Sequence, residues 1–226
     1  MAFFPDAANH NIPPGRNDPP ITARTIVVHT MDGSIEDAEK RFTDGSGIEA
    51  HFGVAMDGRV WQWRDTSRQA DAQAAGNDFG ISVETEDKGD PNKRWTPIQF
   101  QRLVELISWI GRTHSIPMRL VTSTSERGIG FHRQFPEWNP NNHSCPGDVR
   151  LGQLKAELLP TLREGDMPLN ADDKNFLTDL RDDSVRMLDH GNPNEPGHHN
   201  AHSKILQEVA ALQKDIRKLK SHFGIS

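Results

Sequence analysis

The sequence predicts an α/β fold in which helices flank a mixed central β-sheet, with a C-terminal helical appendage. Short β-branched runs indicate buried strands, a two-residue turn signal joins two apolar runs, and amphipathic periodicity indicates helices between strands. A chain of 226 residues suits one domain plus an appendage. We expect an extended N-terminal arm over residues 1–22, a main domain over 23–164 and a helical module over 165–226.

The composition argues against several classes of function. The net charge of −6 does not favour electrostatic capture of nucleic acid or anionic membranes, so we expect no nucleic-acid partner. Membrane insertion is not expected, because no apolar run approaches the ~18 residues of a spanning helix. The single cysteine, Cys145, cannot form an intramolecular disulfide. The first residues lack the basic and apolar regions of a signal peptide, so we expect synthesis as a cytoplasmic protein.

The centre of the chain is expected to form the sheet. The predicted strands are 26–28, 51–56, 59–63 and 79–86, with a short extended segment at 120–122. The first ends at His29. The second and third form a hairpin, because Asp57-Gly58 between apolar runs is a strong turn signal. The last alternates apolar and polar residues, which puts Glu84 and Glu86 on one face.

Three helices are expected around these strands: 34–43, 96–114 and 147–160. Ser34 caps the first, with the acidic Asp37 three residues later. The second begins with Thr96 as N-cap and Pro97 at the first helical position. Between residue 123 and the third helix we expect an irregular loop, since prolines and glycines interrupt it repeatedly.

Two histidines and the single cysteine are candidate metal ligands. His132 and Cys145 lie in the predicted loop, and His29 follows the first strand. Imidazole and thiolate are ligands that Zn²⁺ prefers, and catalytic zinc sites use three protein ligands and keep one position open. The spacing is not a local motif, however. Each histidine taken singly is more typical of a surface or hydrogen-bonded structural residue than of a ligand, and a lone cysteine is more typical of a small buried side chain.

Five stretches in order carry a resemblance to a known family. They are VVHT at 27–30, AHFGVAMDGRVWQ at 50–62, GISVETED at 80–87, GFHRQFP at 130–136 and HSCPG at 143–147. Together they resemble the type-2 N-acetylmuramoyl-L-alanine amidases, which include bacteriophage endolysins and are related to peptidoglycan recognition proteins. The resemblance covers roughly residues 24–162. It implies a mixed sheet with helices on its faces and a shallow groove over a metal ion.

The resemblance also implies a ligand set. The family's zinc-binding positions map onto His29, His132 and Cys145. Some members place a tyrosine before the His-Phe pair, where this chain has Ala50 and no tyrosine anywhere. Other members use a glutamate in the strand that here reads Ile-Ser-Val-Glu, and this position is Glu84.

A mechanism follows from the resemblance as a hypothesis. Zinc would activate water and polarise the amide between N-acetylmuramic acid and L-alanine, and Glu84 would move the proton to the leaving amine. His143, which stands where many members have lysine, would stabilise the oxyanion with zinc. His51 and Thr30 are expected to contact substrate. Glu86 is the competitor of Glu84 on the same strand face.

Structural alternatives remain open for several of these residues. Glu84 is also compatible with a solvent-facing strand position, and His143 with a surface role. His51 is equally compatible with a packed structural histidine. Trp61 and Trp63 could line a sugar groove, although aromatic pairs at period two more often pack a sheet.

The C-terminal module lies outside the resemblance. We expect a helix from about 170 to 188, a hinge at 190–202 and a last helix over 203–223. Apolar residues of the last helix recur at steps of four and three, which predicts a short coiled coil and a possible homo-oligomer. Packing on the main domain is the alternative. The hinge contains four histidines that could bind metal, although its composition favours a solvated linker.

The resemblance therefore implies a phage endolysin. Such an enzyme would be stored in the cytoplasm and, once released in an infected host, would degrade peptidoglycan and cause host lysis, an antimicrobial action. A non-catalytic peptidoglycan-binding module and a cytoplasmic muropeptide-recycling amidase are the alternatives. Cys145 argues against the binding module, since members that only bind tend to lack the third ligand.

Overall fold

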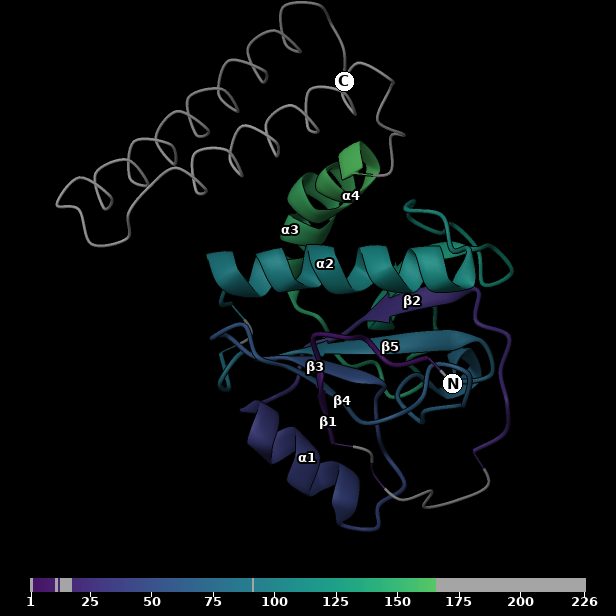
Figure 1. Cartoon of the computed structure of the whole chain (residues 1–226), viewed down its shortest axis with the longest axis vertical. Coiled ribbons are helices and arrows are strands. Elements are labelled where there is room, and N and C mark those ends of the chain that lie inside the picture. Colours follow the sequence, from purple (N-terminus) through teal and green to yellow (C-terminus); the bar gives the residue numbers. More distant parts are fainter. Residues whose placement is uncertain (1, 11, 13–17, 91, 166–226) are drawn as a thin grey trace, which may run out of the picture. The chain divides into compact units, whose positions relative to one another are not determined.

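The computed structural model describes residues 2–10, 12, 18–90 and 92–165. Within this part, a mixed six-stranded sheet runs in the order β1-β4-β3-β5-β2-β6. Helices cover both faces, with α2 (Pro97–His114) on one side and α1 (Ile35–Thr43) on the other (Figure 1). This confirms the predicted α/β class. The predicted appendage over 165–226 lies, except for Gly165, outside the described residues.

The strands are short and mostly parallel. Their bounds are Ala8–Asn9 (β1), Thr25–Val28 (β2), Phe52–Val54 (β3), Val60–Gln62 (β4), Gly80–Thr85 (β5) and Gly128–Phe131 (β6). β3 and β4 form the antiparallel hairpin predicted from Asp57-Gly58. Gly58 adopts φ of 89°, and its N–H donates to the carbonyl of Ala55 at 3.0 Å. The other strand pairs are parallel, and they include β5–β2 and the pairing of β2 with the edge strand β6.

Helices α1 and α2 begin where their capping residues predict. The Ser34 hydroxyl accepts the N–H of Asp37 at 3.1 Å, and the Asp37 carboxylate accepts in return from the Ser34 backbone. The Thr96 hydroxyl accepts the N–H of Gln99. Because these contacts are local in sequence, the pattern alone was sufficient to locate the helix starts.

The third helical segment is longer than predicted. It comprises α3 (Asp148–Gln153), a π-helical turn (Leu154–Leu158) and α4 (Leu159–Gly165). The expected end near Pro160 is therefore wrong. A proline ring clashes with the carbonyl one regular turn earlier, and the widened π turn directly before Pro160 relieves that clash.

Strand β6 was not predicted, because the sequence pattern assigned this stretch to a loop. Its glycines lower strand propensity, yet tertiary packing requires them. A Cβ on Gly128 would lie 2.4 Å from the carbonyl oxygen of Arg119, and one on Gly130 would lie 2.7 Å from the ring of Trp138. Glycine in a strand often marks such a close approach. The neighbouring Leu120 forms an isolated bridge with Ile129, which agrees with the predicted extended segment.

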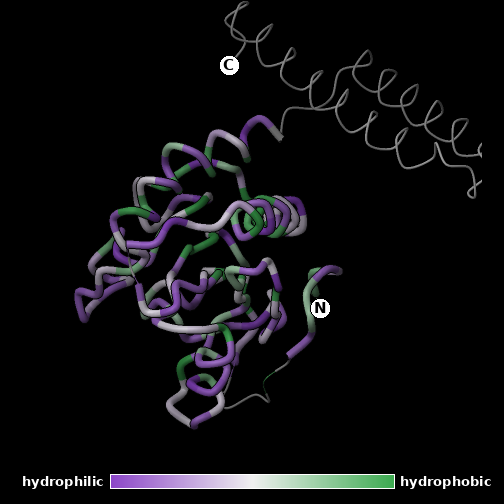
Figure 2. Tube along the Cα trace, turned by 90° about the vertical axis from the view of Figure 1, so that its left-hand side faces the viewer, coloured by the Kyte–Doolittle hydropathy of each residue, from purple (hydrophilic) through white to green (hydrophobic). Residues whose placement is uncertain are grey.

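Apolar layers lie on both faces of the sheet. The larger core packs β2, β3 and β5 against α2, α3 and α4, and the smaller packs the hairpin side of the sheet against α1. The buried apolar residues of α2, which Figure 2 views nearly end-on, belong to the larger core. The described part of the arm packs along this domain: β1 pairs with β4, Phe4 enters the larger core and Ile12 the smaller one.

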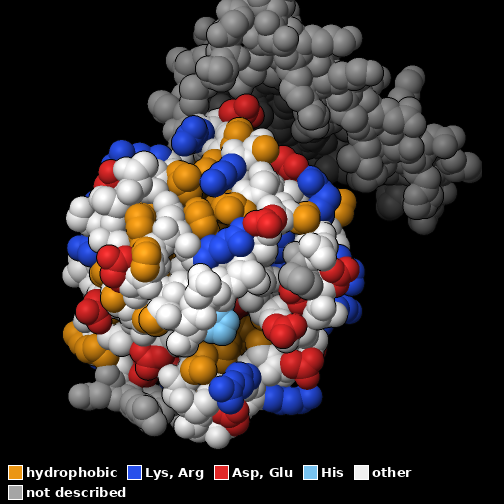
Figure 3. All heavy atoms as spheres, turned by 180° about the vertical axis from the view of Figure 1, so that it is seen from behind, with side chains coloured by type: hydrophobic (Ala, Val, Ile, Leu, Met, Phe, Trp, Pro, Cys, Tyr) orange, Lys and Arg blue, Asp and Glu red, His pale blue; other side chains and the backbone are white. Residues whose placement is uncertain are grey.

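The described surface mixes charges of both signs. Figure 3 shows acidic and basic side chains interspersed over the face opposite to that of Figure 1. Among the described helices, none combines the length and apolar character that a membrane crossing requires.

Candidate metal centre and active site

The site lies where three neighbouring parallel strands end. The register aligns the three residues that precede the candidates: Val28, Val83 and Phe131. The next residues are His29, Glu84 and His132. Their backbones therefore lie side by side at the same position along three adjacent strands. Side chains alternate along a strand, and Val28 points into the core under α2. The three candidates therefore project from the opposite face.

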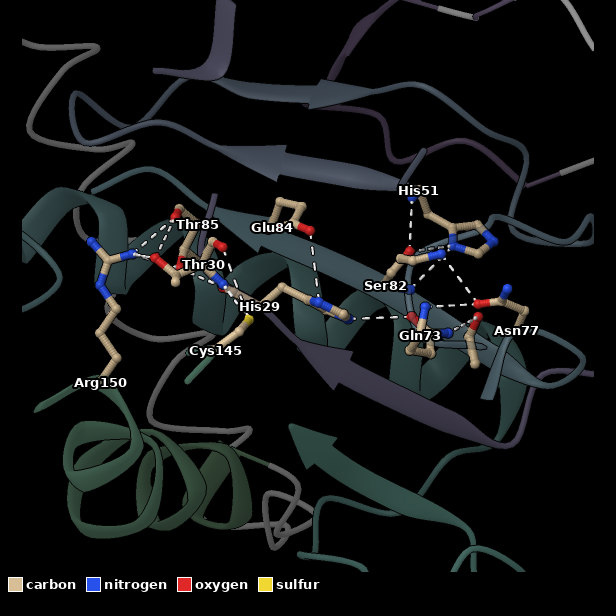
Figure 4. A network of polar contacts seen from close by, with 12 residues as sticks. His29, Thr30, His51, Gln73, Asn77, Ser82, Glu84, Thr85, Cys145 and Arg150 are labelled. Carbon is tan, nitrogen blue, oxygen red and sulfur yellow. Dashed lines mark hydrogen bonds and ion pairs between the residues drawn. The ribbon is translucent and has the colours of Figure 1, made fainter. Parts of the chain in front are cut away.

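Cys145 joins this row from the loop before α3. The ligand atoms of His29, His132 and Cys145 all lie within 4.8 Å of one another. The two imidazole centroids are 4.6 Å apart. The N–H of Thr30 donates to the sulfur of Cys145 at 3.2 Å, although 115 positions separate these residues (Figure 4). The structure thus brings together the three side chains that the sequence suggested as ligands.

Glu84 lies beside this group. Its Oε1 is 3.7 Å from Nδ1 of His29, its side chain is 13% exposed, and its buried Oε2 has no partner among the described residues. Burial raises the pKa of Glu84 to about 8, the negative charge of Asp87 adds to the rise, and the charge of Arg150 opposes it. A cation held by the neighbouring ligands would lower this pKa. Such a carboxyl is suited to accepting and returning a proton near neutral pH.

Burial controls the protonation of the candidate ligands. It lowers the pKa of His29, with the charge of His132 adding to the effect, and it lowers the pKa of His132, with His143 as the next cause. It raises the pKa of Cys145, and the nearby Glu84 raises it further. At neutral pH both imidazoles are therefore neutral and able to coordinate a metal, and the thiol must release its proton when a metal binds.

A pocket of about 500 Å³ opens over these residues. Neither lysine nor arginine belongs to its described lining. The lining does contain five carboxylates: Asp32, Glu49, Asp71, Glu84 and Asp87. His143 lines the pocket and is exposed, with its ring centroid 6.2 Å from that of His132. Thr30 also lines it, although its hydroxyl is already within 3.2 Å of acceptors on Thr85 and Asp87.

His51 lies away from the pocket in which substrate contact was expected. It is 0% exposed, its Nε2 donates to the carbonyl of Arg68 at 2.9 Å, and its Nδ1 accepts the N–H of Ser82 at 3.1 Å. The structure thus gives it the structural role that the sequence had left open. Glu86, the competitor of Glu84, is 2% exposed and accepts the N–H of Met56 at 2.6 Å.

The tryptophans also pack the fold. Trp63 is 0% exposed in the smaller core, and Trp61 stacks on His10 with centroids 3.9 Å apart. Neither lines the pocket.

Arg150 supports the site and was not singled out by the sequence. It is 0% exposed and donates to the carbonyl of Thr85 at 2.8 Å (Figure 4). It also donates to the carbonyls of Glu86 at 2.6 Å and Lys93 at 3.0 Å. It also contacts the hydroxyl of Thr30. Arg150 thereby ties the end of β5 to the residue that follows His29. No local pattern indicates this role, because its partners are distant in sequence.

Gln73 is a second residue that the sequence analysis missed. It is 0% exposed, and its Oε1 lies 3.2 Å from Nε2 of His29 (Figure 4). It belongs to the irregular segment between β4 and β5, where a glutamine would ordinarily be assigned to the surface.

Comparisons with known proteins agree with this fold. The family model described as N-acetylmuramoyl-L-alanine amidase matches residues 17–148. Among solved structures, the N-acetylmuramoyl-L-alanine amidase LysC from Clostridium intestinale URNW is 19% identical, with a TM-score of 0.51 over 69% of this chain and 98% of that one. A mutant of PlyL is 16% identical, with a TM-score of 0.54 over 70% and 98%. The PlyG catalytic domain is 15% identical, with a TM-score of 0.54 over 72% and 96%.

At these identities the structural likeness shows the fold alone. No curated protein matches the chain. The family model, however, spans more than half of the 226 residues, and it includes all five stretches that carry the resemblance. The chain therefore belongs to the N-acetylmuramoyl-L-alanine amidase family.

Proposed function

We propose that this amidase depends on zinc and cleaves the bond between the lactyl group of N-acetylmuramic acid and L-alanine of the peptidoglycan stem. The observation that carries the proposal is the convergence of His29, His132 and Cys145 beside Glu84 in one open pocket.

Zinc fits this group of side chains. Two imidazoles and one thiolate form a donor set that zinc favours over the harder magnesium and calcium ions. Three protein ligands match catalytic rather than structural sites, and the pocket leaves one side open to solvent. Zinc held by His29, His132 and Cys145 would polarise the amide carbonyl and make water a stronger nucleophile at neutral pH.

Glu84 is the proposed proton carrier. Its carboxylate takes a proton from the attacking water as the new carbon–oxygen bond forms, and it returns that proton to the amine as the carbon–nitrogen bond breaks. Its position 3.7 Å from Nδ1 of His29 and its buried Oε2, which has no partner among the described residues, support this role. The chain contains no tyrosine that could share the task.

His143 is the proposed donor to the oxyanion. Its exposed ring lines the same pocket as Glu84 and Cys145, so it can approach a carbonyl bound there. A hydrogen bond that strengthens as negative charge develops on the carbonyl oxygen accelerates amide cleavage. Thr30, in the pocket wall, is the remaining proposed substrate contact.

We further propose that the chain is a bacteriophage endolysin, which acts on the cell wall of an infected host after release from the cytoplasm. A similar structure, described as the endolysin amidase LysCS from Clostridium intestinale URNW, supports this biological setting, at 18% identity. An oligomer formed through residues 203–223 stays a prediction, because these residues lie outside the described part. Sizing of the full chain and of a chain ending at residue 202 tests it.

Digestion of isolated peptidoglycan tests the main proposal. The full chain should release new N-terminal alanine and no reducing sugar ends. A chelator should abolish the release, and added zinc should restore it. Reducing ends without new amines would identify a glycosidase, and undiminished activity after complete zinc removal would overturn the metal assignment.

A further inference from the structure

The far ring nitrogen of His29 faces a buried amide. Gln73 is 0% exposed, does not line the pocket, and places Oε1 3.2 Å from Nε2 of His29. The other ring nitrogen, Nδ1, faces the pocket and lies 3.7 Å from Oε1 of Glu84. The imidazole therefore has one nitrogen towards the protein interior and one towards the candidate metal site.

Two carbonyls determine which way the Gln73 amide points. Its Nε2 lies 3.2 Å from the carbonyl oxygen of Gly76 and 3.3 Å from that of Gly80. Carbonyl oxygens only accept hydrogen bonds, so the NH₂ group must lie on their side and Oε1 must face His29. Since Oε1 is also only an acceptor, Nε2 of His29 must carry the hydrogen that completes the contact.

A neutral imidazole carries a single ring hydrogen. With this hydrogen on Nε2, the lone pair of Nδ1 is free towards the pocket. We propose that Gln73 is a positioning residue, which holds His29 in the tautomer and ring orientation that present Nδ1 to zinc. This inference rests on the proposed zinc dependence.

The surroundings keep the amide in place. A Cβ on Gly80 would lie 2.4 Å from Nε2 of Gln73, and one on Gly76 would lie 2.7 Å from its Cγ. Only glycine leaves room for the glutamine at these two positions. The side chain of Asn77 accepts the backbone N–H of Gln73 at 2.8 Å and thereby fixes the turn that carries it (Figure 4). A rigid partner of this kind preserves the orientation of a metal ligand.

The chain offers a matched control in Gln99. This residue is also 0% exposed, and its Nε2 donates to the carbonyls of Val54 at 2.9 Å and Glu86 at 3.1 Å. Its Oε1 has no partner among the described residues. Gln→Met at either position removes two buried amide-to-carbonyl hydrogen bonds. Only the change at Gln73 also removes an acceptor from a histidine.

Zinc affinity of the full chain is measured by competition with a chromogenic chelator. It separates the loss of the acceptor for His29 from the loss of buried hydrogen bonds that both variants share. Gln73→Met should bind zinc about 10- to 100-fold more weakly than wild type, the usual loss when the partner of a ligating histidine is removed. Gln99→Met should stay within about threefold of wild type, because its hydrogen bonds do not reach a ligand. Both variants should melt at lower temperatures, since each loses two buried hydrogen bonds from an amide to backbone carbonyls.

A Gln73→Glu variant tests whether a loss of zinc affinity in Gln73→Met comes only from destabilisation of the fold. Glutamate keeps an oxygen acceptor for His29 but loses both donors, so it should lose stability and still bind zinc as tightly as wild type. In addition, ¹⁵N NMR of the zinc-free wild type should show the His29 hydrogen on Nε2, and Gln73→Met should populate both tautomers. The Gln73→Glu affinity and the wild-type NMR spectrum remain decisive if Gln73→Met fails to fold.

Three results would overturn the inference while leaving the proposed function intact. These are equal zinc loss in Gln73→Met and Gln99→Met, zinc loss in Gln73→Glu as large as that in Gln73→Met, or a wild-type hydrogen on Nδ1. A wild-type chain that binds no zinc would overturn the proposed function itself, and this inference with it.

Discussion

Two glutamates on one strand face illustrate how surroundings set chemistry at the residue scale. Glu84 faces the pocket with a buried oxygen that has no partner in the described part of the chain, and burial raises its pKa to about 8. Glu86, two residues later, is buried from solvent and accepts the N–H of Met56. The first is therefore suited to proton transfer, whereas the second holds the hairpin against β5.

Glu84→Gln should reduce peptidoglycan cleavage by at least about 100-fold, because the amide cannot accept the water proton. Bound zinc, measured by metal analysis, should be unchanged, since the ligands remain. Glu86→Gln keeps an oxygen for the N–H of Met56 and should retain activity within a few-fold. If Glu84→Gln still cleaves peptidoglycan at the wild-type rate, the Glu84 carboxylate has no part in the mechanism.

His51 should make the protein less stable in mild acid. Burial lowers its pKa from 6.5 to about 4, and a protonated Nδ1 would point a second hydrogen at the N–H of Ser82. Between these values the unfolded chain binds a proton that the folded chain does not. The stabilisation is therefore complete above pH 6.5 and is lost as the pH falls towards 4, by roughly 3 kcal/mol.

Denaturant unfolding across this pH range, with chelator present, measures the effect. His51→Gln cannot titrate there, so its free energy of unfolding should depend less steeply on pH than that of wild type. If the unfolding free energies of the two proteins depend on pH in the same way, the lowered pKa of His51 is contradicted, whatever the absolute stabilities.

At the scale of elements, β6 depends on close approach rather than on strand propensity. Gly128 has φ of 154°, and a Cβ there would meet the backbone carbonyl of Arg119, which cannot move aside as a flexible side chain can. The same strand delivers His132 to the site. Packing of this edge and positioning of a candidate ligand are therefore coupled.

Gly128→Ala should lower the free energy of unfolding by about 2–4 kcal/mol and weaken zinc binding, because the strand must shift. Gly152→Ala is the control. This helical glycine is exposed, and an added methyl group would meet none of the described residues within 4 Å, so the variant should gain about 0.5–1 kcal/mol. Denaturant titration of both variants measures the change in the free energy of unfolding. Equal, small effects would mean that β6 tolerates the extra methyl group.

At the scale of the whole molecule, the candidate site joins three segments that are far apart in sequence. His29 follows β2, His132 follows β6, and Cys145 lies in the loop that leads to α3. An ion held by all three binds the folded chain and not the unfolded one. Its binding free energy therefore adds to the stability of the fold.

Zinc should accordingly raise the melting temperature, and a chelator should reverse the change. Free zinc at 100 times its dissociation constant would contribute about 2.7 kcal/mol. Cys145→Ser should lose most of this shift, because it removes the thiolate ligand. A zinc-independent melting temperature, followed by calorimetry, would contradict a site shared by the three segments.

Local chemistry alone was sufficient for much of the fold. The Asp57-Gly58 turn and the caps at Ser34 and Thr96 use partners within a few residues, so the pattern predicts them correctly. Strand β6 escaped prediction because close packing by distant residues overrides its low strand propensity. The helix beyond Pro160 escaped it because a π-helical turn before the proline makes room for its ring.

The sequence by itself determined the fold class, the main turns and caps and, through the order of five motifs, the family. It also named His29, His132, Cys145 and Glu84 as candidates. Only the tertiary structure decided that these side chains meet, that His51 is packed away from the pocket, and that the amide of Gln73 lies against the ring of His29. The physical reason is that strand register and close backbone approach depend on residues far apart in the chain, which short-range patterns do not encode.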